Sequence, residues 1–386
     1  MHDVFSTHLS VLQMPDHGLR GLGRPGVIAF GGGLPDPAMH PVAALDRLFR
    51  EVLSGNDLSV LGYGHDQGDM RLREAIAARA AGVADAANVV VTTGSADGIG
   101  LVARAMLDPG DVVIAEAATY PGALKAFRLM GAEVIATPVD GEGLVPDCLA
   151  DVLEGLASQG RRVKLLYTIA TCHNPTTTIL AADRRRAILE LARRHDFFVL
   201  DDNTYAEIRF GETPPSFAAL DPDRGIDLGS FSKVIAPGLR MGWVVARKDI
   251  AEGINRARTD LGSSPLVQRV VARFIESGEL GKRLPLLSAH YRSKRDRMLA
   301  GLERHCTGLA EWTIPDGGFF VWLRLLQGDA MSALASGDRE GVTFIPGMYF
   351  AATGGGLTDA LRLSYGEVTV DEMDEGLVRL GRALAG

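Results

Sequence analysis

Short apolar runs alternate with stretches of helical periodicity through the middle of the chain, and this alternation limits the folds open to it. The runs are rich in β-branched residues and lie at 89–92, 112–115, 133–136, 163–167, 197–200 and 242–246. Strands that are apolar at nearly every position are covered on both faces, as in parallel sheets. Strands that alternate with helices are joined by right-handed crossovers. We therefore expect an α/β fold whose large domain has a mostly parallel sheet flanked by helices.

The segment 182–195 illustrates the helical stretches between the runs. Its apolar and basic positions fall on opposite sides of a helix, which predicts one buried and one solvated face. The apolar face carries Ile188, Leu189 and Ala192. The basic face carries Arg185, Arg186 and Arg193.

After about residue 270 the pattern changes, which predicts a second, smaller α+β domain. A long helix is expected from about 286 to 305, with Pro285 near its first turn. Strands and a closing helix should follow, at 317–323, 342–345, 360–364 and from about Val370. We divide the chain into an N-terminal segment that packs on the small domain or on a partner chain, a large domain and a small domain, at 1–45, 46–270 and 271–386.

Composition limits the partners and the compartment. The 386 residues are 46% hydrophobic and 23% charged, as in water-soluble globular proteins, and the formal net charge of −8 disfavours nucleic-acid binding. No apolar run approaches the roughly 20 residues that span a bilayer, and the N-terminus lacks the features of a signal peptide. Cys148, Cys172 and Cys306 show neither metal-ligand nor disulfide spacing. We expect a cytoplasmic protein with no bound metal, no nucleic-acid partner and no membrane segment.

The segment 230–243, Ser-Phe-Ser-Lys-Val-Ile-Ala-Pro-Gly-Leu-Arg-Met-Gly-Trp, holds the strongest chemical signal. It places Lys233 beside small hydroxyl residues and Arg240 beyond a Pro-Gly turn. A lysine amine becomes a nucleophile when burial or a nearby cation lowers its pKa. The apolar strand before Lys233 and the cation after it would do both, which suits a Schiff base with a phosphate-bearing aldehyde. Read alone, a Ser-x-x-Lys segment is more often a surface loop with an ordinary lysine.

The segment Gly94-Ser95-Ala96 follows the run at 89–92 and opens a helix, so its free amides and the helix dipole form an anion cradle. A GxGxxA pattern at Gly98, Gly100 and Ala103 is the rival signal, for a nicotinamide dinucleotide. A dinucleotide fingerprint places its first glycine in the turn directly after the strand. Gly98 lies about one turn into the expected helix, which disfavours the dinucleotide.

Polar and aromatic side chains follow the other runs, namely Tyr120, Asn174, Asp201, Asp202 and Tyr205. Ligands of parallel sheets bind at the carboxyl ends of the strands, so these side chains should lie together. Pro175 holds Asn174 out of the helical region and presents its amide as a donor. Carboxylates at this edge are costly unless they face a cation, such as a protonated pyridine or a metal. No His or Glu at ligand spacing supports the metal.

Arg362 lies between two leucines in the expected strand 360–364. A partly buried guanidinium needs an anionic partner. That partner is either a carboxylate of the protein, in a structural ion pair, or a substrate carboxylate bound in bidentate fashion by the guanidinium.

Taken in order, these signals resemble the class I and II aminotransferases of the fold-type I pyridoxal phosphate superfamily. The chain is most similar to the branch that holds 2-aminoadipate and kynurenine aminotransferases and the catalytic half of MocR-type regulators. Further similar motifs are Gly31 to Pro37, Tyr63-Gly64 ahead of Gly68, and Pro315 to Gly318. The resemblance covers about residues 28 to 384. It implies pyridoxal 5'-phosphate as cofactor, a large domain with a sheet of the seven-stranded type and a smaller α+β domain.

By this resemblance, Lys233 would form the Schiff base with the cofactor and later move a proton at the substrate's Cα. Asp202 would pair with the pyridine nitrogen, while Asn174 and Tyr205 would hydrogen-bond the 3′-oxygen of the ring. Tyr120 would stack on the ring. The resemblance thus makes Lys233, Asp202 and Tyr205 the catalytic residues.

The residues that would hold the cofactor's phosphate are Ser95, Ala96, Ser230 and Arg240. Tyr63 would reach the phosphate of the neighbouring subunit, so the resemblance implies a homodimer with shared active sites. Arg362 would clamp the α-carboxylate of the substrate, with Gly33 and Asn174 beside it. The implied reaction moves an amino group from an L-amino acid to a 2-oxo acid.

The chain departs from the family's pattern at two places. Thr176 to Thr178 follow Pro175 where the family reads Asn-Pro-Thr-Gly, and Asn203-Thr204 interrupts its Asp-Pro-Tyr run. These changes leave a second enzyme class open, a lyase or decarboxylating deaminase acting on a modified amino acid. A ligand-sensing module like that of the MocR regulators is disfavoured, because the roughly 30 residues before Gly31 are too few for a DNA-binding domain.

The side-chain pocket for the substrate has several candidate residues. They are Arg20, Arg24, His65, Glu207, Arg209 and Met348. The identity of the donor and the acceptor stays open.

Overall fold

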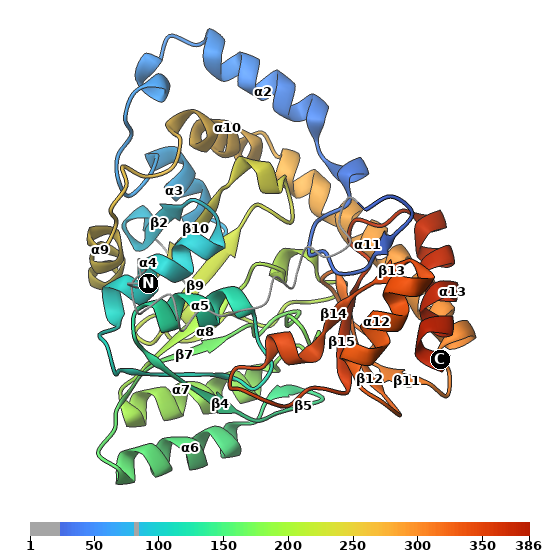
Figure 1. Cartoon of the computed structure of the whole chain (residues 1–386). Helices are drawn as coiled ribbons and strands as arrows, with labels where there is room; N and C mark the ends of the chain where they lie inside the picture. The colour runs from blue at the N-terminus through green and yellow to red at the C-terminus, as the bar shows by residue number, and fades with distance from the viewer. Residues whose placement is uncertain (1–23, 81–84) are drawn as a thin grey trace, which may run out of the picture.

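The computed structural model describes residues 24–80 and 85–386, and Figure 1 shows their arrangement. A seven-stranded sheet forms the centre of the larger part. Its strands, in spatial order, are β2 (Val89–Thr92), β10 (Gly242–Val245), β9 (Gly225–Ser230), β8 (Phe198–Asp202), β7 (Val163–Thr168), β3 (Val112–Glu116) and β4 (Glu133–Thr137). Among these strands β10 runs antiparallel to both neighbours, and the other pairs are parallel. The predicted α/β fold with a mostly parallel sheet is confirmed.

Helices cover both faces of this sheet, which is why its strands are apolar at successive positions. One layer contains α4 (Ser95–Met106), α5 (Pro121–Leu129) and α9 (Lys248–Arg256), and the other contains α6 (Pro146–Ser158), α7 (Ala182–His195) and α8 (Phe217–Leu220). Adjacent residues of a strand point to opposite faces. Leu165 of β7 therefore packs in the core beneath the first layer and Leu166 in the core beneath the second.

The helix predicted at 182–195 is confirmed as α7, and its apolar positions are buried. The prediction that Arg185 lies on a solvated face is wrong, because this side chain is fully buried. Its Nη2 donates to the carbonyl of Ala170 at 2.9 Å, and its Nη1 lies 3.8 Å from the carboxylate of Asp201. A buried guanidinium needs such partners, which come from segments outside the helix.

The smaller part of the molecule is built on a four-stranded antiparallel sheet. Its strands are β11 (Ala310–Trp312), β12 (Phe320–Leu325), β15 (Ala360–Ser364) and β14 (Ile345–Pro346), and the helices beside it are α11 (Glu279–His305), α12 (Ala330–Glu340) and α13 (Val370–Ala385). Near the start of the chain, β1 (Ile28–Ala29) pairs in parallel with β13 (Val342–Thr343). The first described residues therefore lie against the small domain. Residues 1–23 of the predicted N-terminal segment fall outside the described ranges.

The long helix of this part starts earlier than predicted. α11 begins after Gly278, which has a left-handed conformation (φ 78°), so Pro285 lies inside the helix and not in its first turn. α10 (Pro265–Glu276) ends just before this glycine, and the boundary predicted between residues 270 and 271 falls inside α10. The break is made by a single glycine, which adopts positive φ without steric cost.

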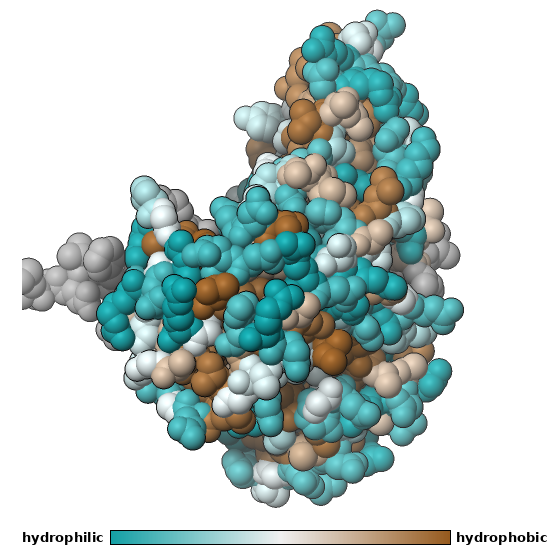
Figure 2. Space-filling model, turned by 90° about the vertical axis from the view of Figure 1, so that its right-hand side faces the viewer, coloured by the Kyte–Doolittle hydropathy of each residue, from teal (hydrophilic) through white to brown (hydrophobic). Residues whose placement is uncertain are grey.

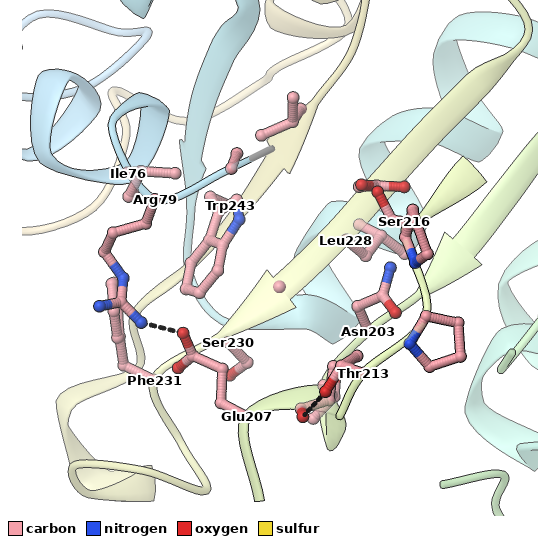
Figure 3. Close-up of a pocket in the computed structure, with 18 residues that line it drawn as sticks. Ile76, Arg79, Asn203, Glu207, Thr213, Ser216, Leu228, Ser230, Phe231 and Trp243 are labelled. Carbon is pink, nitrogen blue, oxygen red and sulfur yellow. Dashed lines mark hydrogen bonds and ion pairs between the residues drawn. The ribbon is translucent and has the colours of Figure 1, made fainter. Parts of the chain in front are cut away.

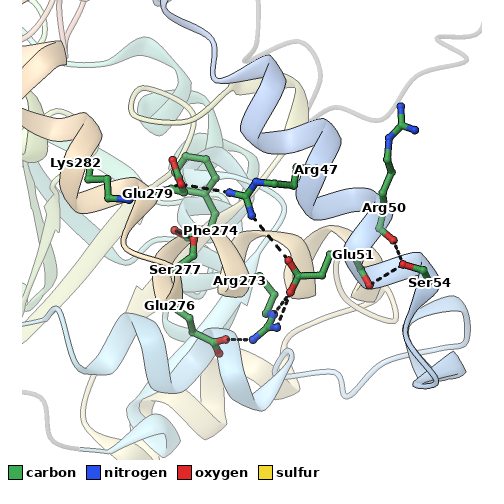
Figure 4. Close-up of polar contacts among 10 residues, drawn as sticks. All are labelled: Arg47, Arg50, Glu51, Ser54, Arg273, Phe274, Glu276, Ser277, Glu279 and Lys282. Carbon is green, nitrogen blue, oxygen red and sulfur yellow. Dashed lines mark hydrogen bonds and ion pairs between the residues drawn. The ribbon is translucent and has the colours of Figure 1, made fainter.

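α2 (Val42–Ser54) lies across α10 and the start of α11, with ion pairs between them (Figure 4). Arg273 donates to Glu51 at 2.5 Å, and Arg47 donates to Glu279 at 3.3 Å. These side chains are partly exposed, so each pair contributes at most about 1 kcal/mol. Burial of Leu48 in the core contributes more, at roughly 2 kcal/mol.

The connections contain the remaining short elements. They are η1 (Pro37–Met39), η2 (Leu58–Leu61), α3 (Met70–Ala77), η3 (Ala86–Asn88), β5 (Val139–Asp140), β6 (Gly143–Leu144), η4 (Ala206–Ile208), η5 (Pro237–Leu239) and η6 (Gly347–Phe350). Figure 2 shows the side of the molecule on which α13 lies, where hydrophobic residues are dispersed among hydrophilic ones. No helix within the ranges 24–80 and 85–386 has the length and apolar character needed to cross a membrane.

Replacement of Gly225, the first residue of β9, by alanine should lower the melting temperature. A Cβ at this position would lie 2.3 Å from the backbone nitrogen of Ala218 in α8, and backbone atoms have little freedom to withdraw. Overpacking of this kind costs about 1–3 kcal/mol. The control is Gly253→Ala in α9, where a Cβ would meet nothing within 4 Å and alanine favours the helix. Equal melting temperatures for the two variants, measured by calorimetry, would contradict the prediction.

Candidate active site

The loops at the carboxyl ends of β7, β8 and β9 meet at one edge of the large sheet. Asn174 lies in the loop after β7, Asp202 ends β8, and Lys233 lies in the turn after β9. Arg362 reaches the same place from β15 of the small sheet and donates to Asn174. Segments far apart in the sequence thus converge at the boundary between the two sheets.

Lys233 lies partly buried at the centre of this site. Its Nζ donates a hydrogen bond to the carbonyl of Gly33 at 2.7 Å and lies 5.6 Å from the centre of the Tyr205 ring. The pKa of Lys233 is lowered to about 8, chiefly by burial and then by the positive charge of Arg362, while Asp202 opposes the shift. An amine with this pKa is partly neutral near pH 7, so it can act as a nucleophile and as a base.

Asp202 is buried and hydrogen-bonded through both carboxylate oxygens. Its Oδ2 accepts from the hydroxyl of Tyr167 at 2.9 Å, and its Oδ1 accepts from the hydroxyl of Thr204 at 2.5 Å. Burial raises the pKa of Asp202, although these donors and the charge of Lys233 favour the ionised form. A buried carboxylate held in one orientation is suited to a cationic partner.

Arg362 is buried between two aromatic rings and forms no ion pair with any described residue. Its Nη1 donates to Oδ1 of Asn174 at 2.6 Å, and its Nη2 donates to the carbonyl of Gly31 at 2.8 Å. The guanidinium lies 3.9 Å from the ring centre of Phe320 and 4.9 Å from that of Phe350. Its Nε has no acceptor in the described part of the chain, and burial lowers its pKa to about 10. The guanidinium is therefore available to an external anion.

The N-terminus of α4 lies where the sequence predicts an anion cradle. Gly94 precedes the helix with φ 83° and no side chain to cap it, so the amides of Ser95 and Ala96 open an uncapped first turn. Arg240 places its Nη2 3.0 Å from the carbonyl of Thr93, and a Cβ on Gly94 would lie 2.7 Å from the same nitrogen. Helix-terminal amides next to a guanidinium are a site for a phosphate group.

Ser230 and Tyr120 are the other two residues expected near this helix terminus. Ser230, whose Oγ donates to Ser232 at 2.9 Å, is paired in the sheet with Gly242, which packs directly against Gly94. Burial raises the pKa of Tyr120, and the charge of Asp202 raises it further, which places the phenol close to that carboxylate.

Tyr205 is buried against Phe319 and Phe320, with ring centres 5.7 and 5.4 Å away. Burial raises its pKa. A Cβ on Gly33 would lie 3.3 Å from Phe320 and 3.6 Å from the hydroxyl of Tyr205. The small size of Gly33 thus lets its loop approach both Tyr205 and Lys233.

Some predicted residues do not join this group. Tyr63 is 89% exposed and has no contact with the site of its own chain among the described residues. Glu207 forms an ion pair with Arg79 and lines a different cavity. Arg24 pairs with a carboxylate of α12 at 3.4 Å, and Arg20 lies outside the described residues.

Sequence reasoning missed the anchor that holds the loop 31–33. Asp36 accepts from Nζ of Lys294 at 2.9 Å and lies 2.9 Å from Nε2 of His290, and Lys294 also donates to the carbonyl of Gly366 at 2.8 Å. Lys294 is buried. The loop held in this way supplies the two carbonyls that receive the lysine and arginine of the site. No local signal marks this contact, because its two partners are 258 residues apart.

A second buried network lies beneath Asn174. Glu116 is 2.9 Å from Nε2 of His173, whose Nδ1 is 2.8 Å from the hydroxyl of Thr176. Thr177 stands where the resemblance predicts glycine and has φ 67°, a strained conformation for a β-branched residue. Its N–H donates to the carbonyl of His173 at 2.7 Å, so this network holds the unusual turn in place.

Comparison with known proteins agrees with this geometry. The family described as aminotransferase class I and II matches residues 34–380. An aromatic-amino-acid aminotransferase 1 of Thermococcus litoralis is 35% identical over 367 residues, covering 93% of this chain and 88% of that protein. A 2-aminoadipate transaminase of Thermus thermophilus is 36% identical over 371 residues, covering 94% and 91%. The structure of Pyrococcus horikoshii kynurenine aminotransferase in complex with PMP has a TM-score of 0.93 at 34% identity, covering 99% of this chain and 97% of that one.

The chain belongs to the class I and II aminotransferases. Its fold is that of the fold-type I enzymes, and it is a pyridoxal phosphate-dependent aminotransferase. The family, the fold and the cofactor predicted from the sequence are confirmed.

Lys294→Met should lower both stability and the affinity for the amino acid. The change removes the amine from the carboxylate of Asp36, and loss of one partner of a buried pair costs about 3 kcal/mol. The loop 31–33 would lose its anchor, and a small displacement at the site should raise KM by roughly tenfold.

The matched control is Lys282→Met on the same helix, where the side chain is 74% exposed. Melting temperature and steady-state kinetics of both variants measure the effect. A Lys294→Met enzyme with the wild-type KM would show that the anchor does not position the loop.

Proposed function

We propose that this enzyme transfers the amino group of an L-amino acid to a 2-oxo acid, with Lys233, Asp202 and Tyr205 as its catalytic residues. The observation that carries the proposal is the amine of Lys233 at the meeting point of the two sheets, where it donates to the carbonyl of Gly33 at 2.7 Å. Burial, and then the charge of Arg362, lowers its pKa to about 8. A lysine in such surroundings suits covalent capture of an aldehyde and the transfer of a proton.

The residues at the strand ends fit the phosphate of pyridoxal phosphate. The uncapped amides of Ser95 and Ala96, the hydroxyl of Ser230 and the guanidinium of Arg240 offer it donors and positive charge. Arg240 has no carboxylate partner in the described ranges, so its charge is available.

The residues around Lys233 fit the ring of the cofactor. Asp202 suits a protonated ring nitrogen, and the bound cofactor then supplies an electron sink for the bonds at the substrate's Cα. Arg362 occupies Oδ1 of Asn174 and leaves its Nδ2 as a donor, so Asn174 and Tyr205 would hydrogen-bond the ring oxygen. Tyr120 offers an aromatic face.

Arg362 would bind the α-carboxylate of the substrate. Its Nε lacks an acceptor among the described residues, and its charge has no described counter-ion, so a carboxylate supplies both. Fixing the substrate at this end, with Asn174 and Gly33 beside it, orients the Cα–H bond. Lys233 would then accept the proton from Cα.

A homodimer with shared active sites is part of the proposal. Leu58, Leu61 and Tyr63 are 71%, 64% and 89% exposed, and Leu261, 63% exposed, precedes a glycine that packs on the same segment. Such a concentration of exposed apolar side chains favours an interface with a second copy. Tyr63 would reach the site of that copy. A cytoplasmic location is supported by the three cysteines, which are all free.

Borohydride reduction of the purified enzyme should fix the cofactor on Lys233. Mass spectrometry of the peptide that contains Lys233 would detect the phosphopyridoxyl group. Lys233→Ala should carry no adduct and lose at least about 10³-fold in amino transfer, because the base at Cα is gone. The control is Lys248→Ala, which alters an exposed lysine at the start of α9. An unmodified Lys233 in the reduced holoenzyme would overturn the proposal.

A single half-reaction separates amino transfer from the alternative of a lyase or oxidative deaminase. When an amino donor is supplied without any 2-oxo acid, an aminotransferase should form one oxo product per site and stop. Ammonia and oxo product are measured together. Continuous ammonia release would show that the reaction is not amino transfer.

A further inference from the structure

A cavity of about 320 Å³ lies beside the large sheet, on the face opposite to Asp202. β9 and β10 form its floor, and η4 and the loop 213–216 form one wall (Figure 3). The strand that ends in Ser230 separates this cavity from the cofactor side of the sheet. Arg362, Asn174 and Gly33, which are assigned above to the substrate's carboxylate end, do not line it, whereas Glu207, a candidate for the substrate side chain, does.

The side chains that line this cavity include one more carboxylate than cations. The ionisable side chains among its described lining residues are those of Arg79, Glu207 and Asp227. Arg79 and Glu207 neutralise each other at one side of the cavity, where Figure 3 shows them facing each other. Asp227 has no cationic partner within 4 Å among the described residues, and its side chain is only partly buried because the cavity exposes it.

The surroundings of Asp227 do not balance its charge. Asp227 is paired in the parallel sheet with Asp201, so the two side chains point to the same face. Arg185, 3.8 Å from Asp201, compensates one of the two carboxylates. Asp227 accepts only neutral hydrogen bonds, from the amide of Ala218 at 3.3 Å and from the hydroxyl of Ser216. Burial and the charge of Asp201 raise the pKa of Asp227 to about 7.

The remaining walls include aromatic side chains beside the polar ones of Asn203, Thr204 and Thr213. Trp243 is paired in the sheet with Gly229, and a Cβ on that glycine would lie 2.1 Å from the indole, so the ring lies flat across β9. Phe231 packs against Trp243 with ring centres 4.5 Å apart. Aromatic rings next to a carboxylate are the surroundings in which proteins bind organic cations.

We propose that this cavity is a second binding site, for a small organic cation with a flat apolar body such as an arylamidine. The charged group pairs with Asp227, and the apolar body lies along Trp243 and Phe231. The volume admits a molecule of about ten non-hydrogen atoms. Because the floor contains Ser230, a bound cation stiffens the strand that carries a donor for the cofactor's phosphate.

Benzamidine is the probe, because it keeps its positive charge near neutral pH and carries no primary alkyl amine that could react with the cofactor. Titration calorimetry of the holoenzyme at pH 8 should give saturable binding of one molecule per chain with a Kd below about 1 mM. Benzamide, its neutral isostere, should not bind. Asp227→Asn should weaken benzamidine at least tenfold, while Asp223→Asn, on the exposed turn before β9, should leave it unchanged.

The pH dependence tests the same group without a mutation. Below its pKa of about 7, Asp227 holds a proton that must leave before the cation pairs with it, so binding weakens as pH falls. The Kd should rise about tenfold between pH 8 and pH 6. The charged groups that face Asp227 from the neighbouring elements are present at both pH values. They are Asp201, Arg185, Arg79 and Glu207.

A second variant keeps the test decisive if Asp227→Asn fails to fold. Thr213 is exposed at the rim of the cavity, and Thr213→Trp should block benzamidine while amino transfer stays at the wild-type level. No saturable binding up to about 10 mM benzamidine would overturn the proposal. Equal affinity in the wild type and the Asp227 or Thr213 variant would also overturn it, as would equal binding of benzamide.

Discussion

The rest of the structure depends on keeping the amine of Lys233 out of water. Burial penalises its charged form, and the positive charge of Arg362 adds to this effect. Asp202 on the large sheet raises the pKa of Lys233, against burial and Arg362. The two sheets must therefore meet at Lys233 for these effects to act on the same amine. The loop 31–33 closes that place by accepting hydrogen bonds from Lys233 and Arg362. The chemistry of the site therefore depends on how the two parts of the molecule pack together.

Most of the fold could be predicted, because its signals are local. The strands of the large sheet are continuous apolar runs, and α7 has the periodicity of an amphipathic helix. The residues of the site were also predictable as a group, because parallel strands bring their carboxyl ends to one edge. Asn174, Asp202 and Lys233 meet for this reason. The roles proposed for these residues came from the family pattern, as for Arg362, whose sequence context alone allowed a structural ion pair.

What the sequence did not reveal are contacts between distant segments. Arg185 falls on the basic face of its helix in the sequence pattern. It is nevertheless buried, because Asp201 and the carbonyl of Ala170 lie within reach of its guanidinium. Asp36 and Lys294 are each unremarkable in the sequence, and only the fold brings them together. Pro285 suggested a helix start because proline is best tolerated there, whereas the turn at Gly278 sets the start of α11. In each case a tertiary partner or a backbone turn overrode the local preference.

Asp201 and Asp202 are neighbours in the chain but serve opposite sides of β8. One takes part in the Arg185 cluster beneath the cavity, and the other faces Lys233. Because side chains alternate along a strand, gain or loss of a single residue within β8 would exchange the two carboxylates and invert every contact beyond them. The alternation of side chains along this strand therefore decides which of the two carboxylates faces Lys233. The loop after β8 departs from the family pattern at Asn203-Thr204, but the strand itself can change its length only by an even number of residues.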